Sequence, residues 1–197
     1  MDTDPRTTPQ ALAEFNQFYS TTHVGEVVAA HPGFVGGSRY ELVDAPPPAA
    51  GQGGPRWLAV YGMADEAAAQ QYLKDNERPW LHRRKYSPWP PARKRAKTIW
   101  RMLWQRTASA GSLTAPAELF LLLRTHQQTK LLLPAGFART TGLALYRGFA
   151  PAESEAPRFC RVHETHTDST TDTFESSANE AAEAFAPLLY RYIPPPD

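Results

Sequence analysis

Among the six histidines of this 197-residue sequence, His23 is the one best placed for chemistry. Phe15, Tyr19 and His23 follow one another at intervals of four residues, so their side chains would share one face of a helix. Desolvation on an aromatic face favours the neutral imidazole, which can act as a general base. Tyr19 could orient the imidazole or hold a carbonyl or phenol oxygen of a substrate. The alternative is a core histidine that bonds a backbone carbonyl.

Further aromatic and imidazole side chains are candidates for substrate contact. Tyr40, Trp57 and Tyr61 fall on two predicted strands, and the register of those strands decides whether they face a cavity or the outside. Trp80 or His82 could close the mouth of that cavity. Aromatic residues on strands are more often core residues, which is the competing interpretation for the three strand positions.

Metal and cofactor chemistry find little support in the sequence. His163 and His166 could offer two ligands, but residues three apart on a strand do not share a face, and no third ligand can be identified. Cys160 is the only cysteine, which excludes an internal disulfide and a thiolate cluster. Signatures of serine hydrolases, zinc proteases, dinucleotide enzymes and P-loop enzymes are absent from the sequence. We therefore expect no cofactor and no metal.

Hydrophobic periodicity predicts the elements that carry these residues. A helix is expected over residues 9–30, where apolar or ring side chains recur every three or four positions until Pro32 and Gly33. Alternation predicts strands over residues 34–43 and 57–63, joined by a loop rich in Pro and Gly.

The remaining elements follow from the same patterns. Asp65 is suited to cap a helix over residues 66–76, and a strand is favoured over a short helix for residues 98–106. Residues 119–124 form a continuous apolar run that predicts a buried strand, and residues 142–149 predict another. We expect no strand before the first helix and none after the last.

The second half of the chain repeats features of the first in the same order, which indicates an internal duplication. The matching segments are residues 32–34 with 134–137, 55–60 with 157–162, and 66–72 with 179–185. The pattern fits two β-α-β-β-α-β units with different pieces missing. The expected fold is α+β, with ferredoxin-like repeats over residues 1–110 and 111–197 whose antiparallel sheets are backed by helices and packed into a barrel.

The N-terminal third resembles a known family. Residues 14–27 (EFNQFYSTTHVGEV), then Pro-Gly-Phe-Val at 32–35 and Arg39-Tyr40, are similar to the EthD-like group of dimeric α/β-barrel proteins. Gly25 stands where that family usually has proline. The resemblance implies a small cofactor-free enzyme of secondary metabolism that acts on an aromatic or polyketide-like compound. Cyclases, decarboxylases and isomerases are the favoured classes, and a cofactor-free monooxygenase is less favoured. The resemblance also implies a homodimer or, through the internal repeat, an intrachain pseudo-dimer.

Residues 78–106 have the most unusual composition in the chain. They hold ten Lys or Arg residues, no acid, and four of the five tryptophans. Three interpretations stay open: a lid that meets the acidic residues of the C-terminal third, a site for an anionic small ligand, and a single-stranded nucleic-acid surface. Nucleic acid is the least favoured, because no RNA- or DNA-binding signature accompanies the segment. A non-catalytic ligand-binding or assembly protein that uses this segment is the alternative function.

The overall composition is that of a globular chain. Hydrophobic residues make up 42% and charged residues 21%, with 21 Lys and Arg against 20 Asp and Glu. This balance gives no sign of a membrane surface or nucleic-acid partner. The first ten residues lack the apolar core of a signal peptide, and no apolar run is long enough to span a bilayer. We therefore expect a cytoplasmic protein. The small-molecule partner is what the family resemblance implies.

Overall fold

The computed structural model describes residues 1, 6–44, 54–77, 86–91, 101–113, 115–150, 157–166, 185 and 187–195. The chain divides into two compact units. The sheet unit comprises Met1, Tyr40–Leu58 and Thr98–Tyr192, and the helical unit comprises Asp2–Arg39, Ala59–Lys97 and Ile193–Asp197. The boundary at residue 110 between the two predicted repeats is a different division of the chain, and it stays a prediction.

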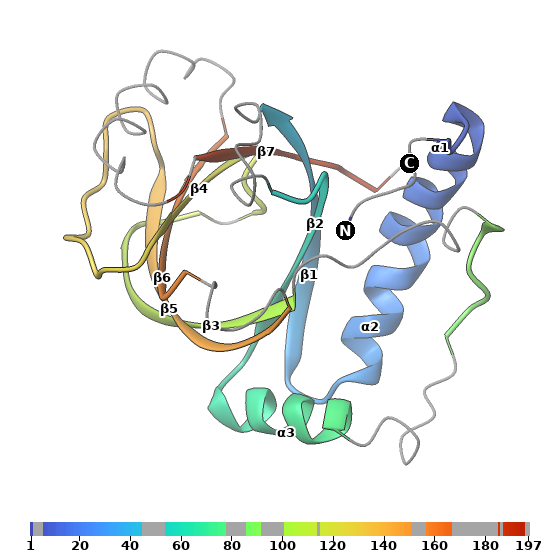
Figure 1. The fold of residues 1–197 in the computed structure, drawn as a ribbon, viewed down its shortest axis with the longest axis horizontal. Coiled ribbons are helices and arrows are strands. Elements are labelled where there is room, and N and C mark those ends of the chain that lie inside the picture. Colours follow the sequence, from blue (N-terminus) through green and yellow to red (C-terminus); the bar gives the residue numbers. More distant parts are fainter. Residues whose placement is uncertain are drawn as a thin grey trace. The chain divides into compact units, whose positions relative to one another are not determined.

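The predicted helix over residues 9–30 is present as three consecutive pieces, α1 (Pro9–Phe18), η1 (Tyr19–His23) and α2 (Val24–Ala30) (Figure 1). The side chain of Thr8 accepts a hydrogen bond from the backbone of Ala11 and so caps the start of α1. The middle piece is a π-helical turn, in which the N–H of Val24 donates to the carbonyl of Tyr19, five residues back. The sequence carries no signal for this wider turn.

The helix ends where the backbone turns into the first strand. Gly33 has a φ of +83°, and a Cβ at this position would lie 2.4 Å from the Cβ of Ala68. A glycine is therefore required both by the turn and by the close approach of the following helix.

The first hairpin and the helix that follows it are confirmed. Strands β1 (Phe34–Asp44) and β2 (Trp57–Met63) are neighbours in the sheet, and α3 (Glu66–Glu77) follows them. The carboxylate of Asp65 accepts a hydrogen bond of 2.9 Å from the N–H of Ala68, so the predicted N-cap is present.

Five further strands follow in the chain: β3 (Arg101–Gly111), β4 (Leu119–Thr125), β5 (Arg139–Ala150), β6 (Phe159–Thr165) and β7 (Leu188–Tyr192). They complete one seven-stranded sheet in the order β2-β1-β7-β4-β6-β5-β3. The strand pairs β1–β7, β7–β4, β4–β6, β6–β5 and β5–β3 are antiparallel, which confirms the α+β class. The strand predicted over 98–106 is confirmed from Arg101 onward, since residues 98–100 lie outside the described residues.

Strand β7 corrects the expectation that no strand follows the last helix. It lies between β1 and β4, with Leu42 opposite Tyr190 and Leu121 opposite Leu189. The strand has only five residues, too few for a clear alternation, and two long neighbours supply its hydrogen bonds. The helix predicted over residues 179–185 lies outside the described residues apart from residue 185.

Both faces of the central strands are buried, and the strands of the sheet unit curl strongly (Figure 1). One cluster of buried side chains lies on one face of β4, and a second lies on its other face. The first contains Tyr40, Phe120, Cys160, Val162, Leu188 and Tyr190, and the second contains Leu119, Leu121, Leu123 and Phe137. Among the described residues, no helix has both the length and the apolar character that a bilayer span requires.

Candidate functional site

The helical unit brings together four of the predicted site residues, Phe15, Tyr19, His23 and Tyr61. Tyr40 and Trp57 belong to the sheet unit, and the predicted residues Trp80 and His82 lie outside the described residues. The four residues of the helical unit therefore define the site that the structure can describe.

His23 lies in a cluster of aromatic rings and is only 9% exposed. Its ring centroid is 5.0 Å from that of Tyr19, in an edge-to-face arrangement, so these two predicted residues are in contact. Two rings from residues 86–91 also meet the imidazole: Trp89 at 4.1 Å and Tyr86 at 5.3 Å between centroids. We call Phe15, Phe18, Tyr19, His23, Tyr86 and Trp89 the His23 cluster.

Tyr19 and His23 are the first and last residues of the π turn. Both side chains are buried, whereas Ser20 and Thr22 between them are partly exposed and Thr21 is exposed. Such turns widen a helix locally and occur frequently at functional sites. The four-residue spacing predicted the shared face, and the two rings are in contact on it.

Glu26 is the acidic neighbour of the imidazole. Its Oε2 lies 3.8 Å from Nδ1 of His23, and its Oε1 accepts hydrogen bonds from the backbone N–H and the hydroxyl of Ser87. These bonds from Ser87, with a smaller contribution from His23, lower the pKa of the Glu26 carboxyl below its usual value. Glu26 is therefore an anion near neutral pH, held in place beside His23. The i,i+3 spacing of His23 and Glu26 was the one sequence signal for this pair.

Arg39 supports the same cluster from β1. The residue is 2% exposed, and its guanidinium carbon lies 4.3 Å from the ring centroid of Tyr19. It donates to the carbonyl and the side-chain oxygen of Asn16 at 3.1 and 3.0 Å, and to the hydroxyl of Ser20 at 3.1 Å. The guanidinium thus fixes the helix to the strand on both sides of the point where the π turn begins.

Tyr61 remains a neutral phenol. Burial raises its pKa strongly, the neighbouring Tyr19 raises it further, and the positive charge of Arg39 lowers it only in part. A phenol that keeps its proton can donate a hydrogen bond to a developing oxygen anion.

Tyr40 and Trp57 are core residues of the sheet unit, as the competing interpretation has it. Tyr40 is 4% exposed and packs on Phe120 with ring centroids 5.1 Å apart. Trp57 is 3% exposed, and the guanidinium of Arg56 lies 4.7 Å from its ring centroid.

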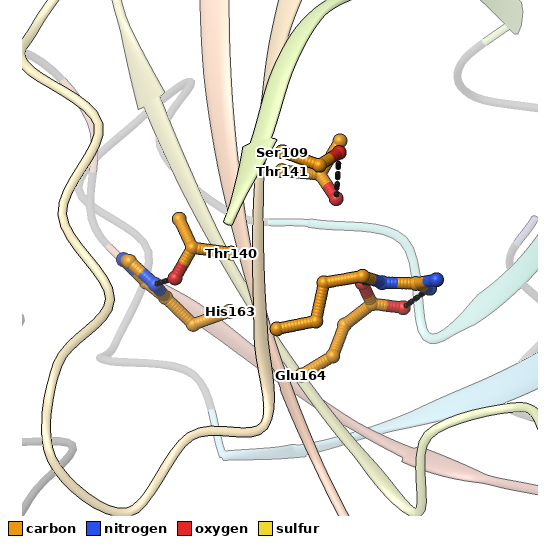
Figure 2. A network of polar contacts seen from close by, with 6 residues as sticks. Ser109, Thr140, Thr141, His163 and Glu164 are labelled. Atoms are coloured by element: carbon orange, nitrogen blue, oxygen red, sulfur yellow. Dashed lines mark hydrogen bonds and ion pairs between the residues drawn. The ribbon is translucent and has the colours of Figure 1, made fainter. Parts of the chain in front are cut away.

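A second polar network lies within the sheet unit (Figure 2). The hydroxyl of Thr140 is 2.7 Å from Nδ1 of the buried His163, and Arg139 forms two hydrogen bonds of 2.5 and 2.6 Å with Glu164. Burial, assisted by the charge of Arg161, lowers the pKa of His163 to about 4. The neutral imidazole is a satisfied core residue.

The spacing of His163 and His166 does not make a metal site among the residues that the structure describes. His163 is buried in β6, whereas His166 follows the strand and is exposed. In that part of the chain, no group of three His, Cys, Asp or Glu residues could hold an ion.

The basic, Trp-rich segment is described only over residues 86–91 and from residue 101 onward. Tyr86 and Trp89 pack against His23. The predicted lid that meets the acidic residues of the C-terminal third stays a prediction. Most of the basic residues of segment 78–106 lie outside the described residues. The alternative function, a binding or assembly protein that uses this segment, therefore stays a prediction.

Comparison with family models, with curated proteins and with solved structures finds no match for this chain.

Proposed function

We propose that the chain is a cofactor-free enzyme in which His23 moves a proton on an aromatic or polyketide-like small molecule. The observation that carries this proposal is the position of Nδ1 of His23, 3.8 Å from the anionic carboxylate of Glu26 inside a cluster of aromatic rings. Cyclisation, decarboxylation and isomerisation all pass through an enol or enolate that one acid-base group can serve.

The carboxylate determines how the imidazole would act. An anion beside Nδ1 favours the tautomer with its hydrogen on Nδ1, which leaves the lone pair on Nε2. Nε2 would then accept a proton from a carbon next to a carbonyl group, and Glu26 would stabilise the imidazolium that forms. Return of that proton to another carbon gives isomerisation. Attack of the enolate carbon on a second carbonyl carbon closes a ring, and the imidazolium returns its proton to the alkoxide oxygen that results.

Tyr19 and Tyr61 are the proposed substrate-positioning residues of this site. The phenol of Tyr61 keeps its proton, so it is suited to donate to the enolate oxygen. Phe15 and Phe18 offer the ring surface on which an aromatic substrate would pack.

A hydrogen-exchange assay with a simple bicyclic ketone tests this function. The protein accelerates the exchange of the α-hydrogens of 2-tetralone in D₂O, measured by NMR, and His23→Gln lowers the accelerated rate by about 100-fold or more. The matched control is His126→Gln, an exposed histidine of the sheet unit. Equal rates for His23→Gln and the wild type would contradict the proposal.

We also propose that the second half is a degenerate ferredoxin-like repeat, as the internal duplication of the sequence indicates. The strand order β7-β4-β6-β5, with antiparallel neighbours, supports this, because β6 separates β4 from β5 as in a split β-α-β unit. The connection between β4 and β5 over residues 126–138 contains no helix, so this repeat would lack its first helix.

A further inference from the structure

The indole of Trp89 lies against four rings that together form one face of the helix. Each ring belongs to α1 or η1, and each centroid lies close enough to the indole for a favourable aromatic contact. The distances are 4.1 Å to His23, 5.2 Å to Phe18, 5.6 Å to Tyr19 and 6.0 Å to Phe15. These are the contacts that a planar aromatic ligand would make on the same face.

The helix face has anchors that do not involve Trp89. Arg39 bonds Asn16 and Ser20 and packs on Tyr19, and all four of these residues lie outside the segment that carries the indole. Phe15 and Tyr19 also contact each other directly, at 5.7 Å between centroids. Removal of the indole would therefore leave a preformed aromatic surface beside His23.

Trp89 reaches this surface from a segment without regular secondary structure apart from a single 3₁₀ residue. Residues 86–91 contain three prolines, and the indole is only partly buried. Ser87 ties the segment to α2 through two hydrogen bonds that both end on one oxygen, Oε1 of Glu26. A ligand ring that replaces the indole would restore the four ring contacts that Trp89 makes.

We propose that Trp89 occupies an aromatic ligand subsite beside His23, and that a planar small molecule with two fused rings replaces the indole when it binds. The inference rests on the proposed function for the chemistry at His23, since the ligand ring would lie against that imidazole. The side chain then competes with the ligand, so the apparent affinity is reduced by the fraction of molecules in which the subsite is covered.

The dissociation constant of 2-naphthol, measured by titration calorimetry, tests the subsite. Trp89→Ala removes the competing ring and binds 2-naphthol at least ten-fold more tightly than the wild type does. The matched control is Trp104→Ala, which deletes a partly buried indole of the sheet unit and leaves the affinity at the wild-type value. Equal affinities of Trp89→Ala and the wild type, or an equal gain in Trp104→Ala, would overturn the proposal.

A second variant decides the matter if circular dichroism shows that Trp89→Ala is unfolded. Trp89→Phe keeps a ring on the helix but covers less of it, so it binds 2-naphthol more tightly than the wild type; an unchanged affinity overturns the proposal. The titration needs no turnover. A failed exchange of 2-tetralone therefore contradicts only the proposed function, and a failed titration contradicts only the subsite.

Discussion

The hydroxyl oxygen of Thr140 lies 2.7 Å from Nδ1 of His163, a residue that is 1% exposed (Figure 2). The imidazole is held neutral, because burial and the charge of Arg161 lower its pKa to about 4. An unfolded chain would take up the proton near pH 6.5. The folded protein is therefore most stable, with respect to this group, above pH 6.5.

The first prediction is a loss of stability in mild acid that depends on His163. Between pH 6.5 and about 4 the unfolded state binds a proton that the folded state does not, so the free energy of unfolding falls by about 3 kcal/mol from this group. Urea unfolding at pH 7, 5.5 and 4 measures the slope. His163→Gln removes this part of the slope, whereas the exposed His166→Gln keeps it. A slope unchanged in His163→Gln would show that His163 has the same pKa in the folded and the unfolded chain.

The second prediction concerns the bond that ties residues 86–91 to α2. Ser87→Ala removes one of the two hydrogen bonds to Oε1 of Glu26 and weakens the hold on the other, so the pKa of Glu26 rises toward its ordinary value of 4.5. His23→Gln raises it less, because the imidazole contributes less than Ser87 does. Titration of the carboxyl carbon by NMR measures both shifts.

Ser109→Ala provides the control for that titration, since this exposed serine of β3 bonds Thr141 and not Glu26. A pKa of Glu26 that is the same in Ser87→Ala and in the wild type would show that Ser87 does not hold the carboxylate in solution.

Local patterns were enough to predict the elements that carry the site. The helix over residues 9–30, the two strands of the first hairpin and the cap at Asp65 all follow from short-range periodicity and turn chemistry, and all are present. The shared face of Tyr19 and His23 follows from the same spacing.

Contacts between distant residues could not be predicted in this way. Ser87 and Glu26 are 61 positions apart, and Arg39 reaches Asn16 over 23 positions, so no window of the sequence contains both partners. Strand β7 owes its existence to pairing with β1 and β4, which a five-residue pattern does not encode. The sequence analysis predicted that Trp80 or His82 covers the site and did not identify Trp89, whose indole contacts the imidazole of His23.

The third prediction is that Gly25→Ala stabilises the protein by about 0.5–1 kcal/mol. A Cβ at Gly25 meets no atom within 4 Å, and alanine reduces the freedom of the unfolded chain at a position that is helical in the fold. Thermal unfolding followed by circular dichroism measures the gain.

Gly33→Ala is the opposite case within the same unit. Its φ of +83° and the 2.4 Å approach to Ala68 predict a loss of about 2 kcal/mol or more. A stabilising effect of Gly33→Ala, or a destabilising one of Gly25→Ala, would contradict the backbone geometry at these two glycines.

The fourth prediction is that Arg39→Lys lowers the free energy of unfolding by about 2–3 kcal/mol. A lysine ammonium cannot reproduce the fork that bonds both oxygens of Asn16 and the hydroxyl of Ser20, and it leaves those partly buried acceptors partly unsatisfied. Arg56→Lys is the matched control, because its ion pair with Glu41 is exposed and contributes at most about 0.5 kcal/mol. Urea unfolding of the two variants separates the cases. If Arg39→Lys were as mild as Arg56→Lys, the guanidinium would not be what fixes the π turn to β1, and Tyr19 and His23 would owe their alignment to ring packing alone.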